Sequence, residues 1–137
     1  MASIFNISEM VSLALHSIII IAVHTGQLVN VKKIAKKIGA SEAHLAKVLQ
    51  QLVKGGYISS VRGPKGGFAL AKAPDDITLF AIYELFEGPI EIEGCPMNCQ
   101  NCAFKSCILG KVPQKLNQEF LNYLNNHKVS DFLGELA

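Results

Sequence analysis

The chain lacks any apolar run that is long enough to cross a membrane. The longest such run is the six residues from Ile18 to Val23, flanked by His16 and His24, whereas a membrane-spanning helix needs about 20 apolar residues. The first ten residues contain no basic run ahead of an apolar segment, so we expect no signal peptide. Internal repeats and low-complexity segments are also absent, and half of the 137 residues are hydrophobic. These features predict a cytoplasmic globular domain with no membrane partner.

Cysteine is absent outside residues 94–107, and four cysteines lie inside this segment: Cys95, Cys99, Cys102 and Cys107. We call residues 94–107 the cysteine segment. In the cytoplasm, clustered cysteines are more typical of metal ligands or redox thiols than of structural disulfides. Thiolates select zinc, copper(I) or iron–sulfur clusters. Only Cys99 and Cys102 have the CxxC spacing of a zinc knuckle, so we expect an iron–sulfur cluster, 2Fe–2S or 4Fe–4S, with zinc as the second choice.

Acidic residues are almost absent from residues 28–72. Glu42 is the one acid in this range, and nine cations minus this acid give a charge of +8. The rest of the chain has four lysines and ten acids, which give −6. Such segregation predicts a positive field at one end of the molecule and a polyanion as its partner. The nine cations are Lys32, Lys33, Lys36, Lys37, Lys47, Lys54, Arg62, Lys65 and Lys72.

The basic region contains a helix-turn-helix pattern. Ser8 can cap a helix that runs to about His24, and its apolar middle should be buried. Helical spacing then predicts a helix over Val31–Ile38 and a second one over Glu42–Lys54. The short link Gly39-Ala40-Ser41 between them, with Ser41 as a cap, is typical of a helix-turn-helix.

A glycine-rich hairpin follows the second of these helices. Tyr57–Val61 and Phe68–Ala71 alternate like two strands, and residues 62–67 between them carry Arg62 and Lys65 among glycines. A helix-turn-helix followed by a basic hairpin is a winged helix. The predicted fold class is therefore mainly α with a small β-hairpin: a winged helix-turn-helix followed by a long C-terminal dimerisation helix.

An α-helix fits the major groove of DNA and presents side chains to bases and phosphates. The outward side chains of Glu42–Lys54, taken alone, are more often an ordinary solvated face. The adjacent basic hairpin favours double-stranded DNA, since an arginine at its tip can enter a minor groove. We therefore expect DNA contacts from Ser41, His44, Lys47, Gln50, Gln51, Arg62, Gly63, Lys65 and Gly66.

The C-terminal part contains two more predicted helices. Thr78 caps one that runs to about Glu87, and Gly88-Pro89 ends it. The last helix spans about Val112–Asn126 and carries an apolar stripe of Val112, Leu116, Phe120, Tyr123 and Leu124. We expect this stripe to pack partly on its own domain and partly on a second subunit. The predicted organisation is a DNA-binding domain over 1–88, a cluster loop over 89–110, and a dimerisation helix with the C-terminal tail over 111–137.

With these residues identified, the whole chain resembles the Rrf-two family of winged-helix regulators, of the IscR, NsrR and CymR type. The stretches ISEMVSLALHSI, IAKKIGASEAHLAKVLQQLVKGGYISSVRGPKGGFAL and CAFKSCILG carry the resemblance, and SVRGPKGGF is its most specific part. The resemblance implies a homodimer with a cluster loop just before the dimerisation helix. It also implies that Arg62 is the wing arginine and that Ser41–Gln51 lies in the recognition helix.

Two features depart from the family pattern. Ala46 stands where members of the iron–sulfur-biogenesis type carry glutamate, so their operator preference does not transfer. Cys99 is additional to the three cysteines of the usual cluster motif, which leaves the fourth ligand and the cluster type open.

Three alternatives to a cluster-modulated regulator use the same cysteines. One is a small zinc or iron–sulfur protein that carries metal or docks on a partner, and another is a cluster-free regulator with a thiol switch. The third is an enzyme with a cysteine nucleophile. No histidine lies beside the cysteines in sequence and no catalytic motif is present, so we expect no enzyme.

Overall fold

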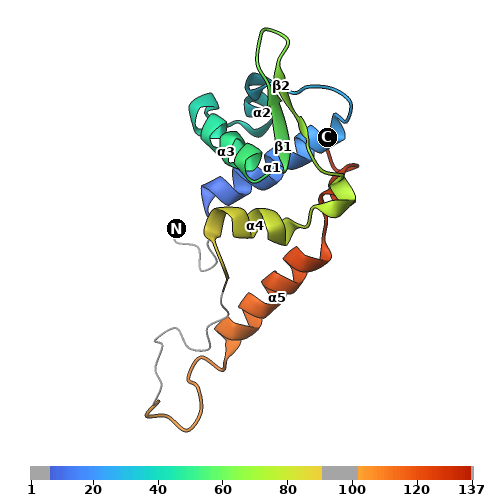
Figure 1. Cartoon of the computed structure of the whole chain (residues 1–137). Coiled ribbons are helices and arrows are strands. Elements are labelled where there is room, and N and C mark those ends of the chain that lie inside the picture. The colour runs from blue at the N-terminus through green and yellow to red at the C-terminus, as the bar shows by residue number, and fades with distance from the viewer. Residues whose placement is uncertain (1–6, 91–101, 137) are drawn as a thin grey trace.

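The computed structural model describes residues 7–90 and 102–136. Figure 1 shows, in chain order, the helix α1, a helix-turn-helix, a two-stranded hairpin and the helices α4 and α5. This arrangement confirms the predicted mainly α fold with a small hairpin. None of the helices in the described ranges is long and apolar enough to span a membrane. The elements are α1 (Glu9–Val23), α2 (Val31–Ile38), α3 (Glu42–Lys54), β1 (Ile58–Val61), β2 (Gly67–Leu70), η1 (Pro74–Asp76), α4 (Leu79–Glu87), α5 (Val112–Asn126) and η2 (Val129–Phe132).

Side-chain caps fix where four of the helices begin. The Ser8, Ser41 and Thr78 hydroxyls accept hydrogen bonds from backbone N–H groups at the starts of α1, α3 and α4, as the sequence predicts. The side chain of Asn30 does the same for α2 and was not identified from the sequence. Helix α5 differs, because Lys111 precedes it with a φ of 56° and provides no side-chain cap.

Strand β1 ends at Val61 as predicted, whereas its start and both ends of β2 lie one residue away from their predicted positions. Strand β1 begins at Ile58 rather than Tyr57, because the Tyr57 N–H donates to the Leu52 carbonyl in the turn that follows α3. Strands β1 and β2 pair antiparallel, with Ile58 opposite Leu70.

A third segment lies against β2. The backbone of Val29 exchanges two hydrogen bonds with Phe68, at 3.0 and 2.8 Å, so the segment before α2 is bonded to the hairpin. A Cβ on Gly67 would lie 2.8 Å from the Val29 carbonyl group. Gly67 also has a φ of 156°, so glycine is required there by both space and backbone conformation.

The hydrophobic core is built around α1. Val11, Ala14, Ile18 and Ile21 of this helix are at most 1% exposed. Helix α1 contacts α2, α3, β2, α4 and η2, so it is buried on nearly all sides, as its apolar sequence predicts. Other buried members of the core are Ile34, Leu45, Leu49, Leu52, Ile58, Ile77 and Ile82.

The chain returns to this core after α5. Leu124, near the end of α5, and Val129 in η2 are buried. The Val129 N–H donates to the Ile77 carbonyl at 2.9 Å, and the Leu79 N–H donates to the His127 carbonyl at 3.0 Å. The C-terminal end of α5 is thereby fixed to the winged-helix core, while its N-terminal end extends away from that core (Figure 1).

Ser17 gives a test of this packing. It is fully buried in α1, and its hydroxyl has no hydrogen-bond partner within the described part of the chain. An unsatisfied buried hydroxyl is destabilising, and alanine is the better helix former. We expect Ser17→Ala to raise the free energy of unfolding by about 1 kcal/mol, measured by urea denaturation at fixed protein concentration. Ser12→Ala, on the same helix but partly exposed, is the control for helix propensity, and a loss of stability in Ser17→Ala would contradict the assignment.

Candidate DNA-binding surface and cysteine segment

The basic part of the sequence forms one end of the molecule. Figure 1 shows α2, α3 and the hairpin together at this end, with the hairpin turn projecting beyond the helices. Helix α5 and residues 102–111 lie at the opposite end. Eight of the nine cations of residues 28–72 therefore lie on α2, on α3 or in the hairpin turn at this end of the molecule.

Helix α3 has one buried and one exposed face. Leu45, Val48, Leu49 and Leu52 are fully buried against the core. On the other side the expected contact residues Lys47 and Gln50 are exposed. Within the described ranges neither of these two side chains forms an ion pair, and both are available to an external partner.

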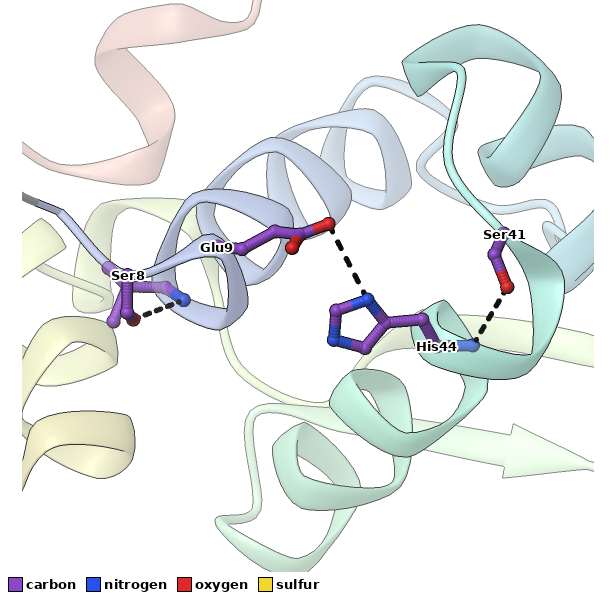
Figure 2. Close-up of polar contacts among 5 residues, drawn as sticks. Ser8, Glu9, Ser41 and His44 are labelled. Atoms are coloured by element: carbon purple, nitrogen blue, oxygen red, sulfur yellow. Dashed lines mark hydrogen bonds and ion pairs between the residues drawn. The ribbon is translucent and has the colours of Figure 1, made fainter. Parts of the chain in front are cut away.

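Ser41 and His44, two other expected DNA contacts, have partners within the protein. The Ser41 hydroxyl accepts the His44 backbone N–H at 3.3 Å and so caps α3 (Figure 2). The imidazole Nδ1 of His44 lies 3.5 Å from the Glu9 carboxylate at the start of α1 (Figure 2). This contact links α3 to α1, and it is an ion pair only when the histidine is protonated. Glu9 was not identified as a site residue, because its contact joins positions that are remote in sequence.

Gln51 is also held by the protein. Its side chain is half-buried, and its Nε2 donates to the Leu85 carbonyl of α4 at 3.4 Å. The face that the sequence groups as Ser41, His44, Lys47 and Gln51 is therefore divided in the structure. Lys47 points to solvent, whereas Gln51 contributes to the packing of α3 on α4.

The hairpin turn presents two cations. Arg62, Gly63 and Lys65 are exposed and Gly66 is partly exposed. A Cβ at Gly66 would lie 2.0 Å from the Val61 carbonyl oxygen, so the turn can close only with glycine at this position. Among the described residues, Arg62 and Lys65 have no ion-pair partner. The turn therefore places two uncompensated charges on a backbone that a partner can approach closely.

The structure describes half of the predicted metal ligands. Cys95 and Cys99 lie outside the described residues, while Cys102 is exposed and Cys107 is partly exposed, both as free thiols. Within residues 7–90 and 102–136, no three or more His, Cys, Asp or Glu side chains come together to hold a metal ion. The predicted set of four ligands therefore stays a prediction.

Cys107 lies in the turn that leads into α5. The Gly110 N–H donates to the Cys107 carbonyl at 3.0 Å, and the backbone N–H groups of residues 109–111 interact with the Cys107 thiol. The backbone N–H groups of Lys111 and Leu109 lower the pKa of the Cys107 thiol, burial opposes this shift in part, and the Gly110 N–H and the Lys111 charge add to it. A thiolate is the form that binds metals and reacts with oxidants, so the chemistry of this residue fits a soft metal or a cluster.

The apolar stripe on α5 is divided between the protein and the solvent. Leu124 is buried, and Phe120 packs edge-to-face on Tyr83 of α4 with 5.5 Å between ring centroids. By contrast, the side chains of Val112, Leu116 and Tyr123 are 46–49% exposed. Phe104, Ile108 and Leu109, just before α5, are also exposed.

Comparison with known proteins gives consistent matches over nearly the whole chain. The Rrf2 family model, described as an iron-dependent transcriptional regulator, matches residues 7–135. A protein of Aquifex aeolicus named as a candidate HTH-type transcriptional regulator is 35% identical over 130 residues, or 93% of this chain and 90% of that protein. The HTH-type transcriptional regulator NsrR of Bacillus licheniformis is 31% identical over 112 residues, or 80% and 78% of the two chains.

A solved structure supports the fold independently. CymR, the global cysteine regulator of B. subtilis, superposes with a TM-score of 0.78 at 23% sequence identity, covering 98% of this chain and all of that one. The relatives that show the family are transcriptional regulators and not enzymes, as the sequence predicts. The chain therefore belongs to the Rrf2 family of transcriptional regulators.

Proposed function

We propose that the protein is a cytoplasmic, homodimeric transcriptional regulator that binds operator DNA, and that an iron–sulfur cluster in the cysteine segment modulates this binding. The main support is the exposed, unpaired cationic surface that α3 and the hairpin turn share at one end of the molecule. Such a surface suits a duplex, whose phosphates supply most of the binding energy. The family assignment makes a DNA partner the expected one.

In this proposal α3 enters the major groove. Lys47 and Gln50 are the exposed side chains best placed to reach phosphates or base edges. Ser41, His44 and Gln51 retain polar atoms near this face, but their contacts with DNA have to compete with those they make in the protein. Arg62 and Lys65, with Gly63 and Gly66 beside them, would follow the backbone or enter a minor groove.

The proposed cluster ligands are Cys95, Cys99, Cys102 and Cys107. The lowered pKa of Cys107 supports ligation, and the family description names iron dependence. A bound cluster would supply reactivity toward oxidants, nitric oxide or changes in iron supply. Zinc is the second choice for the same thiols. A cluster-free thiol switch is a second candidate function, favoured by the free and accessible state of Cys102 and Cys107.

The position of Cys107 suggests how the signal reaches DNA. Cys107 lies four residues before Lys111, the residue that precedes α5 and gives it no side-chain cap. A change in the ligation of Cys107 would therefore act on the N-terminal turn of α5. If α5 forms the subunit interface, this turn sets the relation between the two protomers and the distance between their α3 helices. That distance has to match the half-site spacing of the operator.

The DNA-binding proposal predicts the effect of two substitutions. Arg62→Ala should weaken binding to a duplex that the protein selects from a random pool. Lys47→Ala should weaken it and reduce the slope of log K against log salt concentration by about one unit, if Lys47 contacts a phosphate. Lys115→Ala removes the same charge from α5 and is the matched control. Fluorescence anisotropy measures all of these, and wild-type binding by both Arg62→Ala and Lys47→Ala would refute the assigned surface.

The cluster proposal predicts colour that depends on cysteine. Protein purified without oxygen should contain iron and sulfide and absorb visible light. Cys95→Ser, Cys102→Ser and Cys107→Ser should each abolish the visible band, whereas Cys99→Ser should only weaken it. Stoichiometric zinc without iron, or full colour in these variants, would exclude the cluster. A metal-free protein whose DNA affinity changes on thiol oxidation would support the thiol switch instead.

The dimer proposal predicts self-association through α5. The exposed apolar side chains of Val112, Leu116 and Tyr123 suit an interface between subunits. We expect the wild type to sediment as a dimer at micromolar concentration and Leu116→Asp to sediment as a monomer, because the new carboxylate would be buried at the interface. Asn117→Asp, at an exposed position next to it, should stay dimeric. A monomeric wild type would contradict the proposal.

A further inference from the structure

Helix α2 has a row of lysines that the expected DNA contacts do not include. Four of its eight residues are lysines, and all four are exposed: Lys32, Lys33, Lys36 and Lys37. Ile34 and Ala35, between them in sequence, are buried against the core. The helix therefore has one face in the protein interior and one entirely cationic face in solvent.

These charges are not compensated within the described residues. None of the four lysines forms an ion pair there, and Glu42 is the one acid in residues 28–72. The pairs Lys32/Lys36 and Lys33/Lys37 have i, i+4 spacing, at which like charges destabilise a helix. Lys36 and Lys37 lie in the last turn, where the helix dipole favours cations and offsets part of this repulsion. The fold itself gives no reason for the row, whereas a bound polyanion would relieve the repulsion.

The position of α2 is fixed relative to the proposed DNA-binding surface. Helix α2 packs on α3, and residues 39–41 connect the two helices. Its start is also bonded to the hairpin, because the Val29 backbone exchanges two hydrogen bonds with Phe68. Figure 1 shows α2 at the same end of the molecule as α3 and the hairpin turn. In a helix-turn-helix the first helix crosses the DNA backbone while the second lies in the groove.

We propose that Lys32, Lys33, Lys36 and Lys37 form a phosphate-binding face for duplex DNA, which holds the backbone beside the groove that α3 enters. This inference rests on the DNA-binding function proposed above and adds a separate role to it. A lysine ammonium group is a point charge that binds phosphate without reading the base. The α2 face therefore supplies affinity for any duplex, and α3 and the hairpin turn supply the preference for one sequence.

Duplex DNA is favoured over an anionic membrane as the partner of this face. A helix that binds a membrane surface inserts an apolar face beside its lysines. The apolar side of α2 is instead occupied, because Ile34 and Ala35 are buried and Ile38 packs against the core. Helix α2 also lies at the same end of the molecule as α3 and the hairpin turn, which already suit a groove.

The test replaces all four α2 lysines with glutamine, which keeps helix propensity and removes the charge. The matched control replaces Lys115 and Lys128 with glutamine and is compared with Lys33→Gln/Lys37→Gln, because neither control lysine lies in the cysteine segment or beside Cys107. These two double variants change the net charge by the same amount in different parts of the chain. Circular dichroism checks that each is folded, and Lys33→Gln/Lys37→Gln is the milder variant if the fourfold change unfolds the protein.

The probe is a 30-base-pair duplex of mixed sequence, titrated by fluorescence anisotropy between about 50 and 200 mM salt. We expect the α2 variant to lose about tenfold or more in affinity and to have a salt slope flatter by about 2 to 4 units, since each lost phosphate contact removes about 0.9. Its preference for a duplex selected by the wild type over the mixed duplex should be unchanged. The control should keep a salt slope close to that of the wild type.

Three results would overturn the inference. A wild-type slope in the α2 variant would mean that these lysines do not contact phosphates. An equal loss in the control would mean that overall charge, and not the α2 face, is responsible. If the wild type binds neither duplex, both the DNA-binding function and the inference fail. If the wild type binds normally and the α2 changes have no effect, only the inference fails.

Discussion

The burial of α1 is the interaction on which the rest of the structure depends. Its apolar sequence leaves almost no side that can face water, so other elements have to surround it. On one side these are α2, α3 and β2, and on the other they are α4 and η2. Each fully buried Val, Leu or Ile side chain contributes about 1.5–3 kcal/mol, and five such residues of α1 are buried. The same helix therefore supports the basic end of the molecule and anchors the C-terminal segment.

The two ends of the molecule differ in charge and in exposed apolar side chains. The basic end has uncompensated cations on α2, α3 and the hairpin turn. The opposite end has Cys102, Cys107 and exposed apolar residues such as Ile108 and Leu116. Because α4 packs on α1 and on α5, a rearrangement near Cys107 has a packed route to the core. This arrangement is compatible with ligand control at one end and DNA binding at the other, which is the requirement for coupling between two sites.

The helices could be predicted from sequence because their boundaries are set locally. Ser8, Ser41 and Thr78 cap them through neighbouring N–H groups, and Gly39 ends α2 in the left-handed conformation. The start of β1 differed by one residue, because Tyr57 is bonded back to α3. The stripe on α5 was identified, but its division between Leu124 in the core and Leu116 in solvent depends on where α4 and η2 lie.

The site was predicted less completely because its contacts are long-range. No local pattern shows that Glu9 meets His44, or that Gln51 donates to Leu85. The exposure of Lys47 follows from helix periodicity, whereas the relation of α2 to the hairpin depends on the Val29–Phe68 bonds. Cysteine spacing ranked an iron–sulfur cluster above zinc but could not exclude zinc or thiol chemistry, because all three use the same sulfur atoms.

The central claim is that the end formed by α2, α3 and the hairpin turn binds DNA and the end formed by α5 does not. Amide hydrogen exchange with and without a saturating duplex, followed by mass spectrometry of peptides, tests it most directly. We expect slower exchange in residues 31–54 and 58–70, and little change in residues 112–126. Slower exchange confined to α5, with no change in α2, α3 or the hairpin, would contradict the account.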